Sequence, residues 1–423
     1  MNRAAALALV MILVTACGGG GGGSAPALTG LPGTPTLNIP PSLPAVPNAL
    51  TVTVDAGPAD IGYNVNRLYT DVTICLPGSR TQCQTINHVL VDTGSTGLRL
   101  LSGVMAPDLK LNRQTVNSGL PLLNCAQFVD NTFAWGPVAT ADILLSGKTA
   151  VSVPIQIIAD PAYNNPPLAC SGGGEAITTA KTLGANGIIG LGLFKEDCGP
   201  GCVTNANNEF YYTCTTASCT AAPTPTAASL AQQVKNPVPL FAADNNGVLI
   251  DLPAVSAPGA PSLSGSLIFG IGTQSNNQLT SGKVLTTNSF GYITTRLGAQ
   301  TLTNSFIDSG SNGLFFDSAT IPNCSGNSAG FYCPTSPTTL SATLVGANVV
   351  SSSVFSFSID NATALFAGAT NAVLPTLAGN INNPSTFDPD TFDWGLPFFY
   401  GRRVFIGIEG QSSTLGTGPF YAF

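Results

Sequence analysis

Short apolar runs, separated by Gly, Asn, Ser and Pro, recur along the whole chain. Stretches with the 3.6-residue spacing of an amphipathic helix are scarce. Short apolar segments bounded by turn residues are typical of β-strands. The pattern therefore predicts a mainly β protein with many short strands and frequent turns.

Length and charge limit the expected size of the core and the expected partners. The chain has 423 residues, which is more than one domain usually needs and is ample for a large core. Its net charge is −7, and its 14 Lys and Arg residues form no basic cluster. Because phosphate binding requires a concentrated basic surface, nucleic acid is excluded as an expected partner.

The amino terminus reads MNRAAALALVMILVTAC, a short positive start followed by an apolar run that ends in small residues. This is typical of a secretory signal and is too short for a membrane span. The ending resembles a bacterial lipobox, which implies a signal peptide over residues 1–16 and a lipid on Cys17. The alternative is an ordinary signal with an incidental Cys. No Asp follows Cys17, which favours the outer membrane and leaves the face that it occupies open.

Residues 17–50 are rich in Gly, Ser and Pro and carry almost no charge. Such a segment cannot bury a core, so we expect a tether between the lipid and the folded part of the chain.

The chain has 11 cysteines, and removing Cys17 leaves 11 − 1 = 10, an even number that predicts five disulfides in an oxidising compartment. Local pairs are expected between Cys75 and Cys83, between Cys125 and Cys170, and between Cys324 and Cys333. A second group can pair as a nested hairpin clip or form a zinc site, of which we favour the disulfides. This group comprises Cys198, Cys202, Cys214 and Cys219.

A short repeat is the strongest functional signal. Residues 90–98 read LVDTGSTGL and residues 306–314 read FIDSGSNGL, which places Asp92 and Asp308 in equivalent frames 308 − 92 = 216 residues apart. One such aspartate is common in a turn after a strand, where its side chain caps backbone N–H groups. Two copies in the same frame favour a functional pair over two unrelated turns.

The two motifs resemble those of the pepsin-like aspartic peptidases. The segments NGIIGLG (186–192) and FDWGLPFFYGRRVFIGIEG (392–410) follow them in the order of that family. The resemblance implies an all-β, bilobal fold with a cleft between two β lobes, over residues 51–255 and 262–423. The chain also resembles a bacterial family of predicted lipoproteins whose function has not been assigned.

By this resemblance Asp92 and Asp308 are the catalytic acid and base, which share one proton because close carboxylates cannot both ionise cheaply. One activates a water molecule while the other protonates the carbonyl oxygen. Gly94 and Gly310 let backbone N–H groups approach the carboxylates.

Four hydroxyl side chains are expected to support this pair. Thr93 and Ser309 would hydrogen-bond to the opposite loop and lock the two carboxyl planes together. Ser95 and Ser311 would donate to the outer oxygens of the aspartates in their own motifs. No metal ion or cofactor is needed for this chemistry.

Two residues depart from the family pattern. Trp135 lies where the family places the Tyr of the flap hairpin and is the flap candidate, with an ordinary core aromatic as the alternative. Arg99 can form a salt bridge, bind a substrate carboxylate or reach solvent, of which the last is the default expectation. The other carboxylates singled out are interpreted as caps or turn residues: Asp142, Asp251, Asp317 and Asp393.

The sequence thus predicts a monomeric, lipid-anchored aspartic endopeptidase of the bacterial cell envelope that binds an extended peptide or an unfolded protein. Two alternatives remain open. The first is a catalytically inactive binding module with the same cleft, and the second is a structural outer-membrane lipoprotein. The sequence does not specify the cleavage site or the optimal pH.

Overall fold

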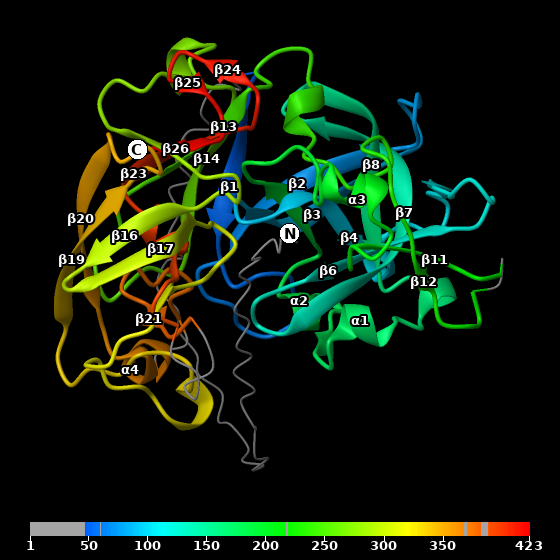
Figure 1. The fold of residues 1–423 in the computed structure, drawn as a ribbon. Coiled ribbons are helices and arrows are strands. Elements are labelled where there is room, and N and C mark those ends of the chain that lie inside the picture. Colours follow the sequence, from blue (N-terminus) through cyan, green and yellow to red (C-terminus); the bar gives the residue numbers. More distant parts are fainter. Residues whose placement is uncertain (1–46, 60, 217–218, 368–369, 382–387) are drawn as a thin grey trace, which may run out of the picture.

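The computed structural model describes residues 47–59, 61–216, 219–367, 370–381 and 388–423. It shows two β-rich lobes side by side, the N-terminal one in blue to green and the C-terminal one in yellow to red (Figure 1). The predicted mainly β, bilobal architecture is therefore present. The predicted signal peptide, Cys17 and most of the predicted tether lie outside the described residues.

Twelve strands lie among the described residues between 49 and 225, as expected for short apolar runs separated by turn residues. They are β1 (Ala49–Val54), β2 (Leu68–Cys75), β3 (Cys83–Asp92), β4 (Thr96–Leu101), β5 (Asn112–Arg113), β6 (Leu122–Gln127), β7 (Thr132–Leu145), β8 (Lys148–Ile158), β9 (Glu175–Ala176), β10 (Gly187–Leu191), β11 (Tyr211–Thr213) and β12 (Thr224–Pro225).

Fourteen strands follow among the described residues from 247 onward. They are β13 (Gly247–Leu252), β14 (Leu263–Phe269), β15 (Val284–Thr286), β16 (Ile293–Leu297), β17 (Gln300–Ile307), β18 (Leu314–Phe316), β19 (Thr338–Val345), β20 (Ser352–Ile359), β21 (Ala378–Gly379), β22 (Phe392–Trp394), β23 (Arg402–Gly407), β24 (Ser412–Ser413), β25 (Gly416–Thr417) and β26 (Phe420–Ala422).

The helices are short connections within loops. The α-helices are α1 (Leu168–Ser171), α2 (Ala180–Leu183), α3 (Gly201–Thr204) and α4 (Ala362–Ala367). The 3-10 helices are η1 (Ser102–Val104), η2 (Pro161–Tyr163), η3 (Val238–Leu240), η4 (Ser275–Asn277), η5 (Gly326–Ser328) and η6 (Leu396–Phe398). No helix within the described ranges is long and apolar enough to cross a membrane.

A shared sheet joins the two lobes. β1 pairs antiparallel with β14 over its whole length, β13 pairs with both β14 and β23, and β23 pairs with β26. The first strand thus lies in one sheet with the last strands of the chain. β1 begins at Ala49, two residues before the predicted lobe boundary at residue 51, and its Val52 and Val54 side chains pack in the core.

The C-terminal lobe contains a seven-stranded sheet in the order β20-β19-β16-β17-β22-β18-β21. Its core is aromatic: the rings of Phe392 and Trp394 stack with centroids 3.9 Å apart, and Phe316 stacks on Phe392 at 4.7 Å. Phe392 and Trp394 are two residues apart on β22 and therefore lie on the same face of the strand. This packing fixes which face of β22 is turned toward the core.

Five disulfides connect the ten cysteines of the described residues, and the three predicted local pairs are among them. The nested pairing expected for the remaining four cysteines is wrong, because Cys198 pairs with Cys202 and Cys214 pairs with Cys219. Each of these bridges closes a loop of four or five residues, so each pair forms within its own turn.

Candidate active site

The two motif aspartates occupy equivalent positions in the two lobes. Asp92 is the last residue of β3, and Asp308 directly follows β17. In the N-terminal lobe, β10 lies between β3 and β4, parallel to the first and antiparallel to the second. In the C-terminal lobe, β22 lies in the same way between β17 and β18. The two apolar segments singled out in the sequence therefore support the two aspartate loops from beneath.

Hydrogen bonds across the lobes hold the two loops together. The Thr93 hydroxyl donates to the carbonyl oxygen of Ile307 at 3.1 Å and accepts from the Ser309 N–H at 2.9 Å. The Ser309 hydroxyl makes the reciprocal bonds, donating to the Val91 carbonyl oxygen at 2.7 Å and accepting from the Thr93 N–H at 3.2 Å. These bonds are buried and symmetric, so they fix the positions of the two aspartates relative to each other.

Glycines allow the two carboxyl groups to face each other closely. A Cβ on Gly94 would lie 2.6 Å from the Asp308 Cγ, and one on Gly310 would lie 2.7 Å from the Asp92 Cγ. Both distances are shorter than any stable carbon–carbon contact. The Gly94 N–H also donates to Oδ1 of both aspartates, at 2.8 Å to Asp92 and 3.0 Å to Asp308. Glycine is therefore required on both loops.

The two supporting serines differ. The Ser311 hydroxyl donates to Asp308 Oδ2 at 2.9 Å, as the sequence predicts. The buried Ser95 hydroxyl makes no hydrogen bond within the described part of the chain, because it lies against Gly190 of β10. The structure does not bring Ser95 to the Asp92 carboxyl, so the two aspartates have different surroundings.

Burial and neighbouring carboxyl groups raise the proton affinity of Asp308. Asp92 and Asp308 are both buried. Burial, followed by the charges of Asp92 and Asp393, raises the pKa of Asp308 well above its usual range, and a hydrogen bond with the Asp92 carboxyl acts in the same direction. The Gly310 N–H opposes these effects. These effects favour the protonated form of Asp308, so the buried pair holds a shared proton more strongly than isolated carboxyl groups do.

Asp393 is a site residue that the sequence interpretation missed. Asp142 and Asp317 accept backbone N–H groups at 2.7–3.1 Å as expected for caps, and Asp251 lies 3.2 Å from Arg403. Asp393 caps nothing: it is fully buried within β22, beside the residues that precede Asp308. The signal was present in FDWGLPFF, where an acid interrupts an apolar run.

Arg99 is buried, so the default expectation that it reaches solvent is wrong. Its guanidinium forms a salt bridge with Asp197 at 3.0 Å and also donates to Asn124 and Gln156 at 2.5 and 2.7 Å. Burial raises the pKa of Asp197, while Arg99 and the Tyr211 hydroxyl lower it. A charge in the core is stable only with such partners, and all of them come from distant parts of the sequence.

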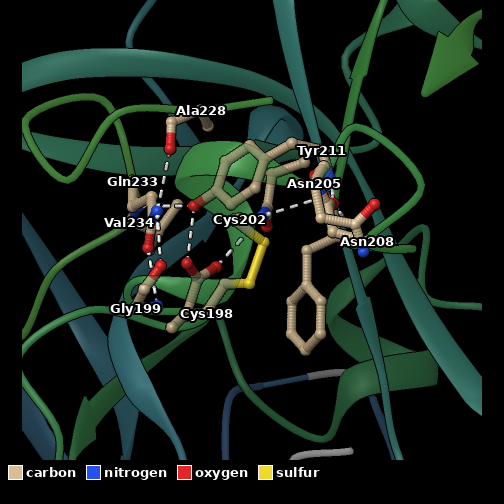
Figure 2. The surroundings of a disulfide bond; sticks show 12 residues. Cys198, Gly199, Cys202, Asn205, Asn208, Tyr211, Ala228, Gln233 and Val234 are labelled. Atoms are coloured by element: carbon tan, nitrogen blue, oxygen red, sulfur yellow. Dashed lines mark hydrogen bonds between the residues drawn. A yellow bond between two sulfur atoms is a disulfide. The ribbon is translucent and has the colours of Figure 1, made fainter. Parts of the chain in front are cut away.

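A disulfide-clipped loop supports this ion pair. The Tyr211 hydroxyl donates to Asp197 at 2.5 Å and accepts from the Val234 N–H at 2.8 Å, beside the Cys198–Cys202 disulfide (Figure 2). The side chain of Gln233 bonds to both backbone groups of Gly199 in the same loop. The loop that carries Asp197 is thus fixed by a covalent bond and by side-chain hydrogen bonds.

Trp135 lies away from the aspartates. Its ring packs edge-on against Tyr212 with centroids 5.4 Å apart, in a cluster that includes the Cys125–Cys170 disulfide. Its indole N–H donates to the carbonyl oxygen of Tyr163 at 2.7 Å. The structure thus places the side chain of Trp135, a residue of the β6–β7 hairpin, in a buried cluster, with its single donor already occupied.

A cavity of about 530 Å³ adjoins the Asp92 loop. One wall is mainly aromatic and comes from the C-terminal lobe, with Phe290, Tyr292, Phe306 and Tyr421. The lining from the N-terminal lobe includes polar side chains, among them the Arg99–Asp197 ion pair, Gln127, Asn205, Asn208 and Glu209. The cavity therefore lies between the lobes, and it begins at the loop that carries one of the two carboxylates.

The chain matches one protein family and is similar in fold to solved structures. The model of the family described as "Protein of unknown function (DUF3443)" matches residues 44–423. A search of the curated proteins found no match. Among solved structures, the aspartic proteinase from Irpex lacteus has 13% sequence identity and a TM-score of 0.46, with 88% of this chain and 96% of that chain covered. Basic 7S globulin from soybean has 11% identity and a TM-score of 0.42, with 89% and 96% covered.

Proposed function

The chain belongs to that family, and we propose that it is an aspartic-type endopeptidase that hydrolyses peptide bonds with Asp92 and Asp308. One observation carries this proposal. Two buried carboxyl groups from different lobes meet in a symmetric frame, and the surroundings of Asp308 keep one proton on the pair. A pair with one proton can supply an acid and a base at the same moment.

The asymmetry of the pair assigns the roles. Asp92, in the ionised form, takes a proton from a water molecule, whose oxygen then attacks the carbonyl carbon of the peptide. Asp308, in the neutral form, gives its proton to the carbonyl oxygen. When the resulting diol collapses, the proton now on Asp92 passes to the amide nitrogen and a hydroxyl proton returns to Asp308. The pair ends in its starting state, so no other acid or base is consumed.

The cavity supports a peptide substrate over a small molecule. Its position between the lobes suits a chain that passes the pair in extended form and places one side chain in the cavity. The aromatic wall favours an apolar stem, and the N-terminal lobe offers Gln127 and Glu209 to a polar end group. An extended peptide or an unfolded protein therefore fits the proposal.

One observation favours a second candidate, a catalytically inactive binding module. The β6–β7 hairpin contributes Cys125, Ala126 and Gln127 to the cavity, while Trp135 lies in the core. None of these side chains carries a phenol hydroxyl that could close over the substrate. The same cavity would then bind a peptide or a glycan without cleaving it.

The deciding experiment uses the purified full-length chain on a denatured protein mixture from about pH 3 to 7, the range that a carboxylate pair can span. We expect cleavage by the wild type and its loss in Asp92→Asn and in Asp308→Asn. Absence of cleavage by the wild type, or equal cleavage by both variants, refutes the peptidase. Tight binding of a statine-type inhibitor without cleavage would support the binding module.

We also propose that the protein is anchored to the bacterial envelope by a lipid on Cys17. The support is the sequence alone, a signal-like run that ends at this Cys and is followed by a Gly-rich segment. Mass spectrometry of the mature amino terminus would show the lipid, and Cys17→Ser should release the protein from the membrane fraction. An unmodified Cys17 would refute the anchor.

A further inference from the structure

The buried carboxyl group of Asp393 has no role in the mechanism described above. Its side chain is fully buried, and neither of its oxygens receives a hydrogen bond within the described part of the chain. A buried polar group without a partner costs about 1–3 kcal/mol, and an isolated charge costs far more. Such a residue in a core strand calls for a function that offsets this cost.

The strand itself directs Asp393 toward the active site. The neighbours Phe392 and Trp394 stack on each other in the aromatic core, so the intervening Asp393 lies on the opposite face of β22. β22 also holds the backbone of the catalytic loop, because the Asp308 N–H donates to the Trp394 carbonyl oxygen at 3.0 Å. The carboxyl group is therefore held rigidly beside the Asp308 loop.

Ser311 lies between the two acids. Its hydroxyl hydrogen is directed to Asp308 Oδ2 at 2.9 Å, and the same hydroxyl is close enough to Asp393 to favour its charged form. A neutral Asp393 can donate its proton to the Ser311 oxygen, which still has lone pairs available. The three side chains then form one chain of donors that ends on Asp308.

The charges around Asp393 favour its neutral form. Burial raises its pKa well above the usual range, and the charge of Asp92 adds to this effect, whereas Ser311 opposes it. Burial raises the pKa of the Tyr421 hydroxyl on β26, and the charges of Asp308 and Asp393 act in the same direction. The buried guanidinium of Arg67 interacts electrostatically with both catalytic aspartates. Three close carboxyl groups cannot all ionise, so at least one proton is retained.

We propose that Asp393 is a third carboxyl group of the active site, a positioning residue that is linked to Asp308 through Ser311 and shares with the catalytic pair the protons that three buried carboxyl groups retain. Its effect on catalysis rests on the proposed peptidase function. Its protonation and its coupling to Asp308 do not, so stability and activity measurements can separate the two ideas.

The first experiment measures unfolding of the full-length protein from pH 4 to 8. A carboxyl whose pKa is higher in the folded than in the unfolded state binds more protons when folded, so stability falls as the pH rises above about 4. Asp393→Asn keeps the shape of the neutral side chain and cannot ionise, so this fall should be smaller. Asp142→Asn, at a buried aspartate that caps Gly78 and Ser152, is the matched control and should keep the fall.

Coupling is tested in the Asp308→Asn background. The effect of Asp393→Asn on the pH dependence should be smaller there than in the wild type, because the two acids interact. Equal pH dependence for wild type and Asp393→Asn, or strictly additive effects of the two substitutions, overturns the proposal. If Asp393→Asn does not fold, Ser311→Ala serves instead: it removes the hydroxyl that favours the charged form of Asp393, so the fall of stability with pH should become larger, and an unchanged or smaller fall overturns the proposal.

The second experiment uses the pH profile of cleavage. Asp393→Asn removes the negative charge that the third acid carries when it ionises, so the pair should lose its shared proton at lower pH. The alkaline limb of the profile should therefore shift to lower pH. At the pH where the wild type retains half of its activity, we expect Asp393→Asn to be slower by roughly twofold, the effect of a limb shifted by half a pH unit. A uniform loss at every pH would indicate a merely structural role and overturn the proposal. Absence of cleavage by the wild type refutes only the peptidase, because the unfolding experiment still decides the state of Asp393.

Discussion

The reciprocal hydrogen bonds between the two aspartate loops allow a prediction that depends only on the structure. Thr93→Val replaces the hydroxyl by a methyl group and keeps the branched shape of the side chain. It removes the bond to the Ile307 carbonyl oxygen at 3.1 Å and the bond from the Ser309 N–H at 2.9 Å. Both backbone groups lie in the buried interface between the lobes, where water cannot easily replace the lost partner.

The expected magnitude follows from counting the groups left unpaired. A buried donor or acceptor without a partner costs about 1–3 kcal/mol, so two of them cost about 2–6 kcal/mol. We expect Thr93→Val to lower the free energy of unfolding by about 3 kcal/mol, in the lower half of this range, because the loops can relax slightly. Thr70→Val is the matched control: Thr70 is also buried, but its hydroxyl makes one bond, to the carbonyl oxygen of the exposed Thr51 at 3.1 Å. Its loss should cost at most about 1 kcal/mol because water can reach that oxygen.

Chemical denaturation of the full-length protein measures both values, with the free energy of unfolding extrapolated to water. Thr93→Val should be destabilised by at least 1 kcal/mol more than Thr70→Val. Equal destabilisation would refute the reasoning, because it would mean that the hydroxyl of Thr93 does not hold the lobes together. The Ser309→Ala variant, which removes the reciprocal bonds, should behave like Thr93→Val.

Three further predictions concern other parts of the site. Arg99→Met leaves a buried carboxylate unpaired and should lower the free energy of unfolding by about 3–5 kcal/mol, which denaturation would show; a change below 1 kcal/mol would contradict the buried ion pair. Gly310→Ala places a Cβ 2.7 Å from the Asp92 Cγ, so the carboxyl must move by roughly 1 Å and cleavage should slow about 100-fold, whereas unchanged kinetics would contradict the close approach. Replacing Cys125 and Cys170 by Ala opens a 45-residue loop and should lower the free energy of unfolding by about 4 kcal/mol, because the unfolded chain gains entropy. Thermal unfolding measures this effect, and an unchanged midpoint would contradict it.

The local features of this protein were predictable because short motifs specify them. The strand-loop pattern around Asp92 and Asp308, the glycines at Gly94 and Gly310 and the bridge between Cys75 and Cys83 depend on residues close together in the sequence. A turn needs particular residues at particular positions, and a repeat of such a turn is visible without any structure.

The features that the sequence interpretation missed depend on long-range contacts. Arg99 looked like a solvent-exposed residue because its partner Asp197 lies 98 residues away. For Trp135 the sequence left a flap residue and a core aromatic both open, because its ring partner Tyr212 comes from a later strand. Neither partner can be found from spacing, since the distance along the chain does not limit which strands pack together.

The sequence alone determined the mainly β class, the two aspartates and their glycines, because periodicity and turn chemistry act over a few residues; the two lobes were implied by the resemblance of the repeated motif to a known family. Only the tertiary structure decided how these parts meet: that Thr93 and Ser309 bond across the lobes, that Ser311 and not Ser95 reaches its aspartate, and that Asp393 lies beside the pair. The reason is physical, since burial and charge depend on all the strands that surround a residue.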